Sequence, residues 1–282
     1  MTPPRMLRVE LHCHTVASPD GHITVDGLVR TARRRGIDVV AITDHDTIDG
    51  ALDVRRFAER RDVGLRIVVG EERTLADGSH VIGLFLEEAI RSDTLPEAAR
   101  EIDEQGGICV LPHPFRRRDG VLRDGSAAVR AEDDGGVTAV LGELAARDTA
   151  SPLAFEIFNP KCSLDENERA RELLGSGLAV VGGSDAHYEA DVGECVNVVA
   201  YDTDVESSLR RALARPGGVR VLGVPQRPGS SGRKYAPLYY RIKPYVRVPR
   251  PLVPAANRLY RMYLNGIAKR TLAPLEEKYG GG

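Results

Sequence analysis

The sequence predicts an α/β protein built as a closed or distorted (β/α) barrel. Apolar runs alternate along the chain with helical patterns, which is typical of parallel strands joined by helices. At least seven such runs fall between residues 7 and 201, and this number favours a barrel over an open sheet. The alternative is a doubly wound sheet, but the G-x-G-x-x-G motif that usually follows its first strand is absent here.

The predicted strands are short and mostly aliphatic. In chain order they cover residues 7–11, 37–43, 65–70, 80–86, 107–111, 153–158, 178–183 and 195–201. On the first strand, we expect Leu7, Val9, Leu11 and Cys13 to share the face that packs against the outer helices, because alternate residues of a strand share a face.

Three helices are predicted from residues that typically begin and end helices. They cover residues 25–36, 94–107 and 163–177. The first has Thr24 as its N-cap and Gly36 past its C-terminus. The other two each begin with a capping box, formed by Thr94 with Glu97 and by Ser163 with Glu166.

Charge divides the chain into two parts. The 282 residues carry a net charge of −2, but residues 1–222 carry −12 and residues 223–282 carry +10. The second part is a basic extension rich in proline and tyrosine, with a possible short helix over residues 255–270. We expect it to lie across the acidic body or a second subunit; single-stranded nucleic acid or an anionic membrane surface are the alternatives.

Neither a membrane span nor a secretory signal is visible. No apolar stretch reaches membrane-spanning length, and the N-terminus lacks the apolar core of a signal peptide. The four cysteines are far apart and form no C-x-x-C motif. These features predict a reduced, cytoplasmic protein.

Histidines gather where strands begin or end. Six of the seven lie at predicted strand boundaries, at least four of them at carboxyl ends, which form the active-site face of a β/α barrel. His12 and His14 are two residues apart and therefore point the same way, and so do Asp185 and His187. Imidazole and carboxylate groups together suit zinc, manganese or iron(II), so this pattern predicts a multinuclear metal site.

The motifs HCHT–SPDG, AITDHD, VVGEE, HVIGLF, LPHP and GGSDAH follow one another in this order. Over about residues 7–200 they resemble the PHP (polymerase and histidinol phosphatase) family of metal-dependent phosphoesterases. The resemblance implies a distorted (β/α)7 barrel, TIM-like, holding two or three divalent ions (Mn, Fe or Zn). Glu71 would bridge the ions, with Glu72 as the alternative. The implied ligands are His12, His14, Asp20, His45, Glu71, His80, His113, Asp185 and His187.

One departure from the family pattern narrows the resemblance. The family's histidine-pathway phosphatases carry a further histidine after a later strand, where this chain has "FEIFNP" with Glu156 and Asn159. The chain looks more like the small phosphoesterase branch, whose members act on nucleoside bisphosphates and short oligonucleotides. The domain that these enzymes often insert before the "HP" motif is missing here, so their fine specificity does not transfer.

Further roles are expected around the ligands. The metal ions would polarise phosphoryl oxygens and activate water, and Asp185 or His187 would carry a proton to the leaving group. Arg116 or Arg117, in the basic run after "HPF", would bind the substrate phosphate. Asp44, Asp46, Glu156 and Asn159 are candidates to orient the ligands, and His22 is expected at the surface.

The sequence thus predicts a metal-dependent phosphoesterase that hydrolyses a phosphomonoester or phosphodiester of a nucleotide or another small metabolite. Two alternatives stay open: a phosphatase of the histidinol-phosphate type, and a metal-binding regulatory module without catalysis. Metal identity, oligomeric state and pathway do not follow from the sequence.

Overall fold

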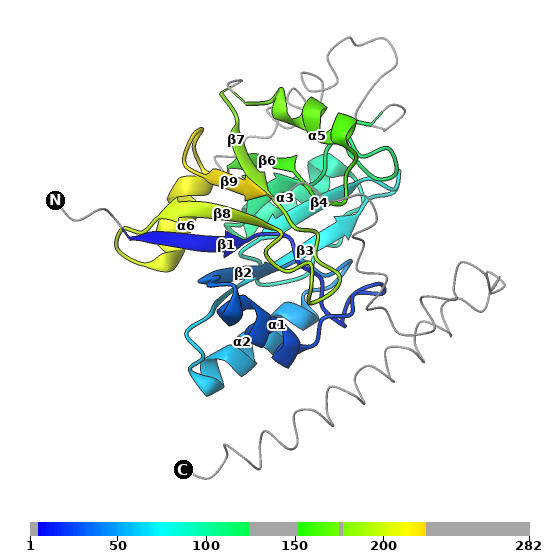
Figure 1. The fold of residues 1–282 in the computed structure, drawn as a ribbon. Helices are drawn as coiled ribbons and strands as arrows, with labels where there is room; N and C mark the ends of the chain where they lie inside the picture. The colour runs from blue at the N-terminus through cyan, green and yellow to red at the C-terminus, as the bar shows by residue number, and fades with distance from the viewer. Residues whose placement is uncertain (1–4, 124–151, 175–176, 224–282) are drawn as a thin grey trace, which may run out of the picture.

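A computed structural model describes residues 5–123, 152–174 and 177–223 of the chain. In these residues nine strands form a single sheet in the order β7-β6-β5-β4-β3-β2-β1-β8-β9 (Figure 1). The strands are β1 (Met6–Glu10), β2 (Val39–Ile42), β3 (Arg66–Thr74), β4 (His80–Leu84), β5 (Ile108–Leu111), β6 (Leu153–Phe158), β7 (Ala179–Gly182), β8 (Cys195–Ala200) and β9 (Arg220–Gly223).

The sheet curls into a nearly closed, distorted barrel, as the sequence predicts. Parallel pairing joins β1 to β2, β2 to β3, β5 to β6 and β6 to β7, whereas β4, β8 and β9 pair antiparallel with their neighbours. The Asn197 side chain on β8 closes the gap to β7: its Nδ2 donates to the Gly182 carbonyl (2.7 Å) and its Oδ1 accepts from the Gly182 amide (2.8 Å).

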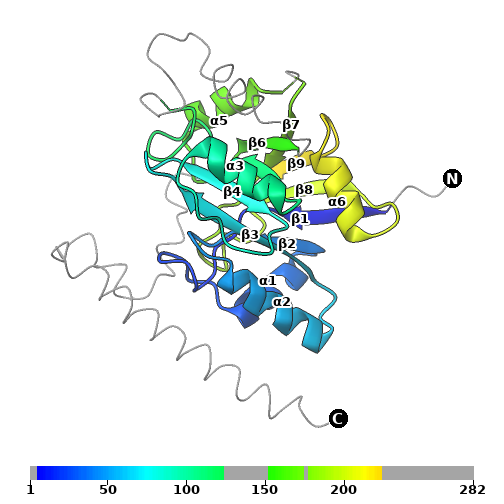
Figure 2. The same cartoon turned by 180° about the vertical axis from the view of Figure 1, so that it is seen from behind.

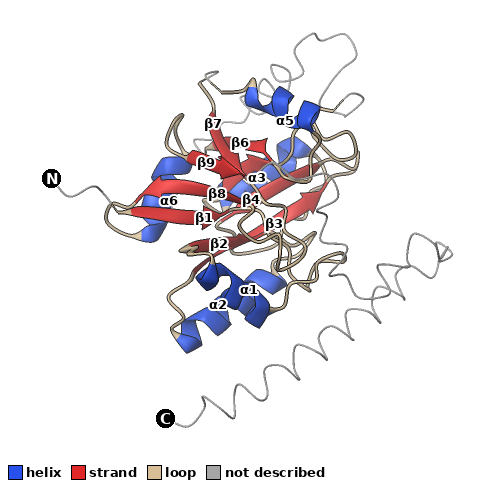
Figure 3. Ribbon diagram, in the orientation of Figure 1, coloured by secondary structure: helices blue, strands red, loops and turns tan. Residues whose placement is uncertain are grey.

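Helices lie around the outside of the curled sheet (Figures 2 and 3). The predicted cap of the first helix is present, since Thr24 accepts from the Gly27 amide, and so is the Ser163/Glu166 capping box. The Thr94/Glu97 box does not form, because the Thr94 hydroxyl bonds the Glu97 carboxylate and not the helix backbone. The helices are α1 (Val25–Arg34), α2 (Asp49–Arg61), α3 (Leu95–Glu104), α5 (Leu164–Arg171) and α6 (Val205–Leu213).

Three elements were not predicted, namely α2, α6 and β9. Helix α2 has no side-chain cap, so the sequence carries no start signal for it. Helix α6 does have one: the Asp204 side chain accepts from the Ser207 amide. Strand β9 reaches Gly223, one residue beyond the expected boundary at 222, and the basic extension that follows lies outside the described residues.

The core consists of two apolar clusters. The outer one joins the sheet to α1, α2, α3 and α5, and the inner one fills the barrel and packs against α6. The prediction for the first strand was wrong for Leu7, Val9 and Leu11, which lie in the inner cluster, and only Cys13 joins the outer one. The strand ends at Glu10, so regular alternation stops there and the chain can turn His12 and His14 inward as well.

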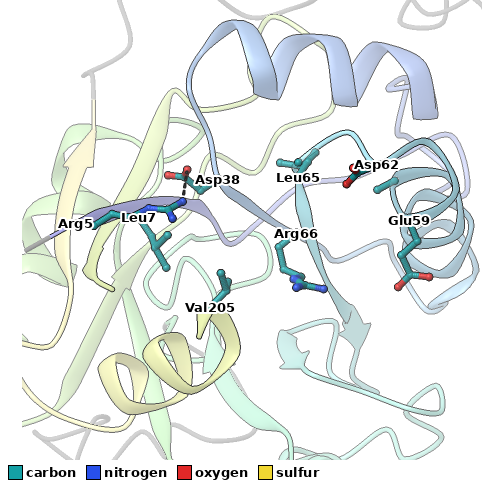
Figure 4. A pocket seen from close by; sticks show the side chains of 10 residues that line it. Arg5, Leu7, Asp38, Glu59, Asp62, Leu65, Arg66 and Val205 are labelled. Atoms are coloured by element: carbon teal, nitrogen blue, oxygen red, sulfur yellow. Dashed lines mark ion pairs between the residues drawn. The ribbon is translucent and has the colours of Figure 1, made fainter. Parts of the chain in front are cut away.

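A hollow of about 370 Å³ opens where β1 and β3 begin (Figure 4). Apolar and charged side chains mix there, and Arg5 faces Asp38 at 3.9 Å. In β/α barrels this end serves stability, whereas sites form at the carboxyl ends of the strands. Among the described residues, no helix is long and apolar enough to cross a bilayer.

Candidate metal centre

Glu72 lies at the centre of a ring of imidazoles. It is near the end of β3 and only 1% exposed. Both of its carboxylate oxygens lie within 3.5 Å of histidine nitrogens that come from the loops after β1 and β2, from β4, and from the loop after β5. The contacts are His12 Nε2 (3.2 Å), His14 Nε2 (3.1 Å), His45 Nδ1 (3.5 Å), His80 Nδ1 (2.9 Å) and His113 Nε2 (3.0 Å).

Glu71 lies outside this ring, so the structure favours Glu72 as the bridging carboxylate. Neighbouring residues of a strand point to opposite faces, and the Glu71 side chain accepts from the Ile90 amide at 2.8 Å. Burial there raises the pKa of Glu71 to about 7. The structure thus brings Glu72, the alternative named from the sequence, into the cluster and leaves Glu71 outside it.

Asp185 and His187 enter from the loop after β7, and Asp20 enters from the loop after β1. Asp185 Oδ1 lies 3.4 Å from His14 Nε2 and 3.3 Å from His187 Nδ1. Asp20 Oδ2 lies 3.2 Å from His187 Nε2 and 3.8 Å from His45 Nε2. Four groups of atoms in the described residues are close enough to share an ion. Two contain these aspartates: His12, His14, Glu72 and Asp185, and His14, Asp20, His45 and His187; the other two are His45, Glu72 and His80, and His80, His113 and Asp119.

The chemistry of these groups fits divalent cations. His14 Nε2 and His45 Nδ1 are buried and make no hydrogen bond among the described residues, as expected for ring nitrogens that serve as ligands. Burial alone would lower the pKa of His14, but the Asp185 and Glu72 carboxylates raise it to about 9. Burial likewise opposes ionisation of Asp185, yet His12 and Arg116 hold its pKa well below the usual range.

Glu156 supports the ring from outside. Its Oε1 lies 3.0 Å from His12 Nδ1, which leaves Nε2 of that ring directed at Glu72. Its Oε2 accepts from the His113 amide (2.7 Å) and from Asn159 Nδ2 (2.9 Å). Glu156 and Asn159 thus lie where an orienting role requires them.

The two aspartates that flank His45 have other partners. Asp44 is buried and accepts from the amide and hydroxyl of Thr15. Asp46 accepts from Arg73 and from the Thr74 amide. Neither aspartate makes a hydrogen bond to a ring of the cluster among the described residues, so the structure gives no support to an orienting role for them.

Arg116 contacts Asp185 of the cluster, whereas Arg117 and Arg118 have other contacts. Its Nη1 lies 2.6 Å from Asp185 Oδ2. Arg117 turns away and lines a separate hollow of about 290 Å³ with Phe115, Arg123 and residues of α5, and the Arg118 side chain is 87% exposed. Of the three arginines, Arg116 is the one that contacts Asp185 of the cluster.

Two residues differ from expectation around the site. His22 is half-buried and its ring stacks on Tyr188, with the ring centres 4.6 Å apart. Asp119 was not singled out at all, yet it is 3% exposed and its carboxylate lies close to His80 and His113. It belongs to none of the motifs, and no signal in the sequence indicated it.

Backbone strain marks the same region. His113 and Asp185 have positive φ angles of 31° and 49°, which are rare for residues with a side chain. Such conformations persist where surrounding contacts over-determine them, and they cluster at functional sites.

Comparison with known proteins gives the family. The PHP domain model matches residues 10–176, and the PHP-associated model matches residues 165–215. The uncharacterized protein MJ1587 of Methanocaldococcus jannaschii is 36% identical over 120 residues, covering 39% of this chain and 68% of that protein. A protein of Acetivibrio thermocellus that has been assigned as a phosphatase is 27% identical over 207 residues, covering 66% and 81%.

A solved structure gives the same fold. It is a protein of Bifidobacterium adolescentis that has been assigned as a metal-dependent phosphoesterase, with a TM-score of 0.52 at 18% identity. The match covers 76% of this chain and 98% of that one. Since the PHP model also spans more than half of the sequence, the chain belongs to the PHP domain family of metal-dependent phosphoesterases.

Proposed function

We propose that this chain hydrolyses a phosphomonoester or phosphodiester of a nucleotide or another small metabolite. The observation that carries the proposal is the position of Glu72, one buried carboxylate within 3.5 Å of five imidazoles. Two further carboxylates, Asp20 and Asp185, lie beside the same rings. The assignment of the Acetivibrio relative as a phosphatase supports this chemistry.

Two or three divalent ions (Mn, Fe or Zn) are the proposed cofactors. Bound there, they would supply positive charge that polarises phosphoryl oxygens and activates water at neutral pH. The proposed ligands are His12, His14, Asp20, His45, Glu72, His80, His113, Asp185 and His187, all contributed by the proposed catalytic unit of residues 1–222.

The substrate's phosphate would lie between the ring cluster and Arg116. The Arg116 guanidinium presents several donors and can bind two phosphate oxygens at once. It is tethered to Asp185 on the side that faces the cluster, so the phosphate is drawn toward the proposed ligands. Arg117, the second arginine proposed for this role from the sequence, lines the neighbouring hollow and would act only on a longer substrate.

Proton transfer to the leaving group is proposed for His187 or Asp185. The His187 ring is partly exposed and lies 3.3 Å from Asp185 Oδ1, so it borders both solvent and the buried cluster. A group in that position can give a proton to a departing alkoxide and regain one from water.

The structure offers an argument against the histidinol-phosphate alternative. At the place where those phosphatases carry a further histidine ligand, Glu156 pairs with His12 from outside the ring. It therefore supports a ligand and does not extend the set.

A panel of substrates tests the proposal. Purified protein should contain at least two equivalents of divalent metal and release phosphate from one or more of nucleoside monophosphates, nucleoside bisphosphates, short oligonucleotides and histidinol phosphate. His12→Ala should abolish the best of these activities, whereas Asp53→Ala, on the exposed side of α2, should keep it. Full activity in His12→Ala would refute the site, and a silent panel with metal bound would favour the regulatory module.

A further inference from the structure

We propose that Asp119 is a positioning residue of the metal centre, which fixes the ring of His113 and holds Arg116 beside Asp185. This inference rests on the proposed metal site and adds a residue that the family motifs do not include. Asp119 lies in the loop after β5, residues 113–122, whose sequence indicates only a basic surface loop.

The loop folds back on itself and onto β4. The Arg116 amide donates to the His113 carbonyl, and the Leu122 amide donates to the Pro114 carbonyl. Gly120 permits this close approach, since a Cβ there would meet the Pro114 carbonyl oxygen at 2.4 Å. The Asp119 carbonyl then accepts from the His80 amide at 3.1 Å. This fold places the Asp119 side chain beside two histidines of the ring.

The two oxygens of the Asp119 carboxylate have different partners. Its Oδ1 accepts from Arg116 Nε and lies 3.5 Å from His113 Nδ1. Its Oδ2 lies 3.4 Å from Nε of the exposed Arg118 side chain and accepts no hydrogen bond from the described residues. His113 Nδ1 likewise has no hydrogen-bond partner there. The buried Nδ1 of His113 thus lies next to the Asp119 carboxylate and has no hydrogen bond to any other described group.

On the opposite side of the cluster, a carboxylate and a histidine have the same arrangement, and there they are hydrogen-bonded. There, Glu156 Oε1 lies 3.0 Å from His12 Nδ1 while His12 Nε2 faces Glu72. On the Asp119 side, His113 Nε2 faces Glu72 at 3.0 Å and Nδ1 faces Asp119. A carboxylate on the far nitrogen of a ligand histidine selects the tautomer and raises the basicity of the ligating nitrogen.

The same carboxylate connects the ring to the substrate side. Arg116 is held at Nε by Asp119 and at Nη1 by Asp185, so two buried carboxylates fix the plane of the guanidinium. Loss of the Asp119 carboxylate would remove the contact at Nδ1 of His113 and one of the two contacts that hold the Arg116 guanidinium. A direct-ligand role is the competing possibility, because atoms of His80, His113 and Asp119 lie close enough to share an ion.

The two roles predict different behaviour for Asp119→Asn. In the positioning role, Oδ1 of Asp119 makes the contacts with Arg116 and His113, and asparagine keeps that oxygen. A direct ligand would use Oδ2, the oxygen that accepts no hydrogen bond, and asparagine replaces it with an NH2 group that does not bind cations. We therefore expect Asp119→Asn to bind as many ions as the wild type, and Asp119→Ala to bind one of them about 10- to 100-fold more weakly.

The measurements are Mn²⁺ titration of chelator-treated protein by calorimetry, the visible spectrum of the Co²⁺ form, and ¹⁵N NMR of the His113 ring in Zn²⁺-loaded protein. The NMR should show the Nδ1–H tautomer in the wild type and in Asp119→Asn. Asp53→Asn, which breaks an exposed Asp–Arg pair on α2, is the control. Circular dichroism of the metal-free variants checks folding.

Three outcomes separate the possibilities. Equal Mn²⁺ affinities in the wild type and Asp119→Ala would overturn the positioning role. Loss of the same ion in both Asp119 variants would also overturn the positioning role, and would show that Asp119 is a direct ligand. An Nε2–H tautomer of His113 in the wild type would overturn it too. Wild-type protein that binds fewer than two ions would instead refute the proposed function, whatever the variants do.

Discussion

At the scale of single residues, Glu71 and Glu72 show how the pleat of a strand separates two identical side chains. Both are buried, but Glu72 faces five imidazoles, whereas Glu71 faces the backbone amide of Ile90. The motif VVGEE predicts a carboxylate at the end of β3, but it does not show which of the two glutamates faces the site. The reason is that β3 continues to Thr74 and pairs with β4 beyond the predicted strand end.

The pair offers a matched test of the bridging carboxylate. We expect Glu72→Gln to lose at least one divalent ion and at least 100-fold in phosphate release, because the amide removes the negative charge that the ions share. Glu71→Gln should keep its metal content and most of its activity, because its carboxylate oxygen bonds a backbone amide. Metal analysis and initial rates of both variants check this, and the reverse ranking would restore Glu71 as the bridge.

The sequence was enough to predict the histidines of the site, but only some of the residues that support them. His12, His14, His45 and His113 follow strands, and the carboxyl ends of barrel strands meet at one rim. Asp119 depends instead on the fold of a loop, on the close approach at Gly120, and on a backbone bond to His80 about forty residues earlier in the chain. None of these appears as a spacing in the sequence.

At the scale of elements, the junction after β7 shows why the site tolerates little extra volume. Gly183 directly follows this strand and lies next to Glu156 and His12, and an added Cβ would lie 1.7 Å from Glu156 Oε1 and 2.6 Å from His12 Cβ. The strands were predicted from their apolar runs, but this contact between β6, β7 and the chain after β1 depends on how they pack. It ties the geometry of the ring to the spacing of the strands.

Gly183→Ala should therefore weaken metal binding by displacing Glu156 from His12. We expect a fall of about 10- to 100-fold in affinity for one ion, as for other losses of a carboxylate that orients a ligand histidine. Gly36→Ala is the control: that glycine has a φ of +63° and open space around it, so alanine should lower stability without changing metal affinity. Equal affinities in wild type and Gly183→Ala, measured by Mn²⁺ titration, would contradict the argument.

At the scale of the whole molecule, the Asn197 side chain helps to close the barrel. Asn197 on β8 bonds both backbone groups of Gly182 on β7, and its Nδ2 also lies 3.3 Å from the Val9 carbonyl on β1. The barrel class followed from the number of apolar runs, but the reversed direction of β8 and its side-chain link to β7 did not, because an apolar run does not reveal the direction of its strand.

Asn197→Leu should destabilise the metal-free protein by on the order of 2–4 kcal/mol, because leucine leaves the buried amide and carbonyl of Gly182 without partners. Urea unfolding followed by circular dichroism measures this. Ala200→Leu, at an exposed position of the same strand, should change the free energy of unfolding far less. An unaltered unfolding midpoint in Asn197→Leu would show that the link does not contribute to barrel closure.

The pairing of β1 with β8 also means that the barrel can close only late in synthesis of the chain. Met6 pairs with Ala200, so the first strand waits for nearly the whole domain to be synthesised before its second neighbour exists. Asp185 and His187 lie on the same late segment. A nascent chain that has reached residue 176, where the PHP match ends, would present an open sheet edge and an incomplete set of ligands. The complete set of proposed ligands would therefore be present only after this late segment has been synthesised.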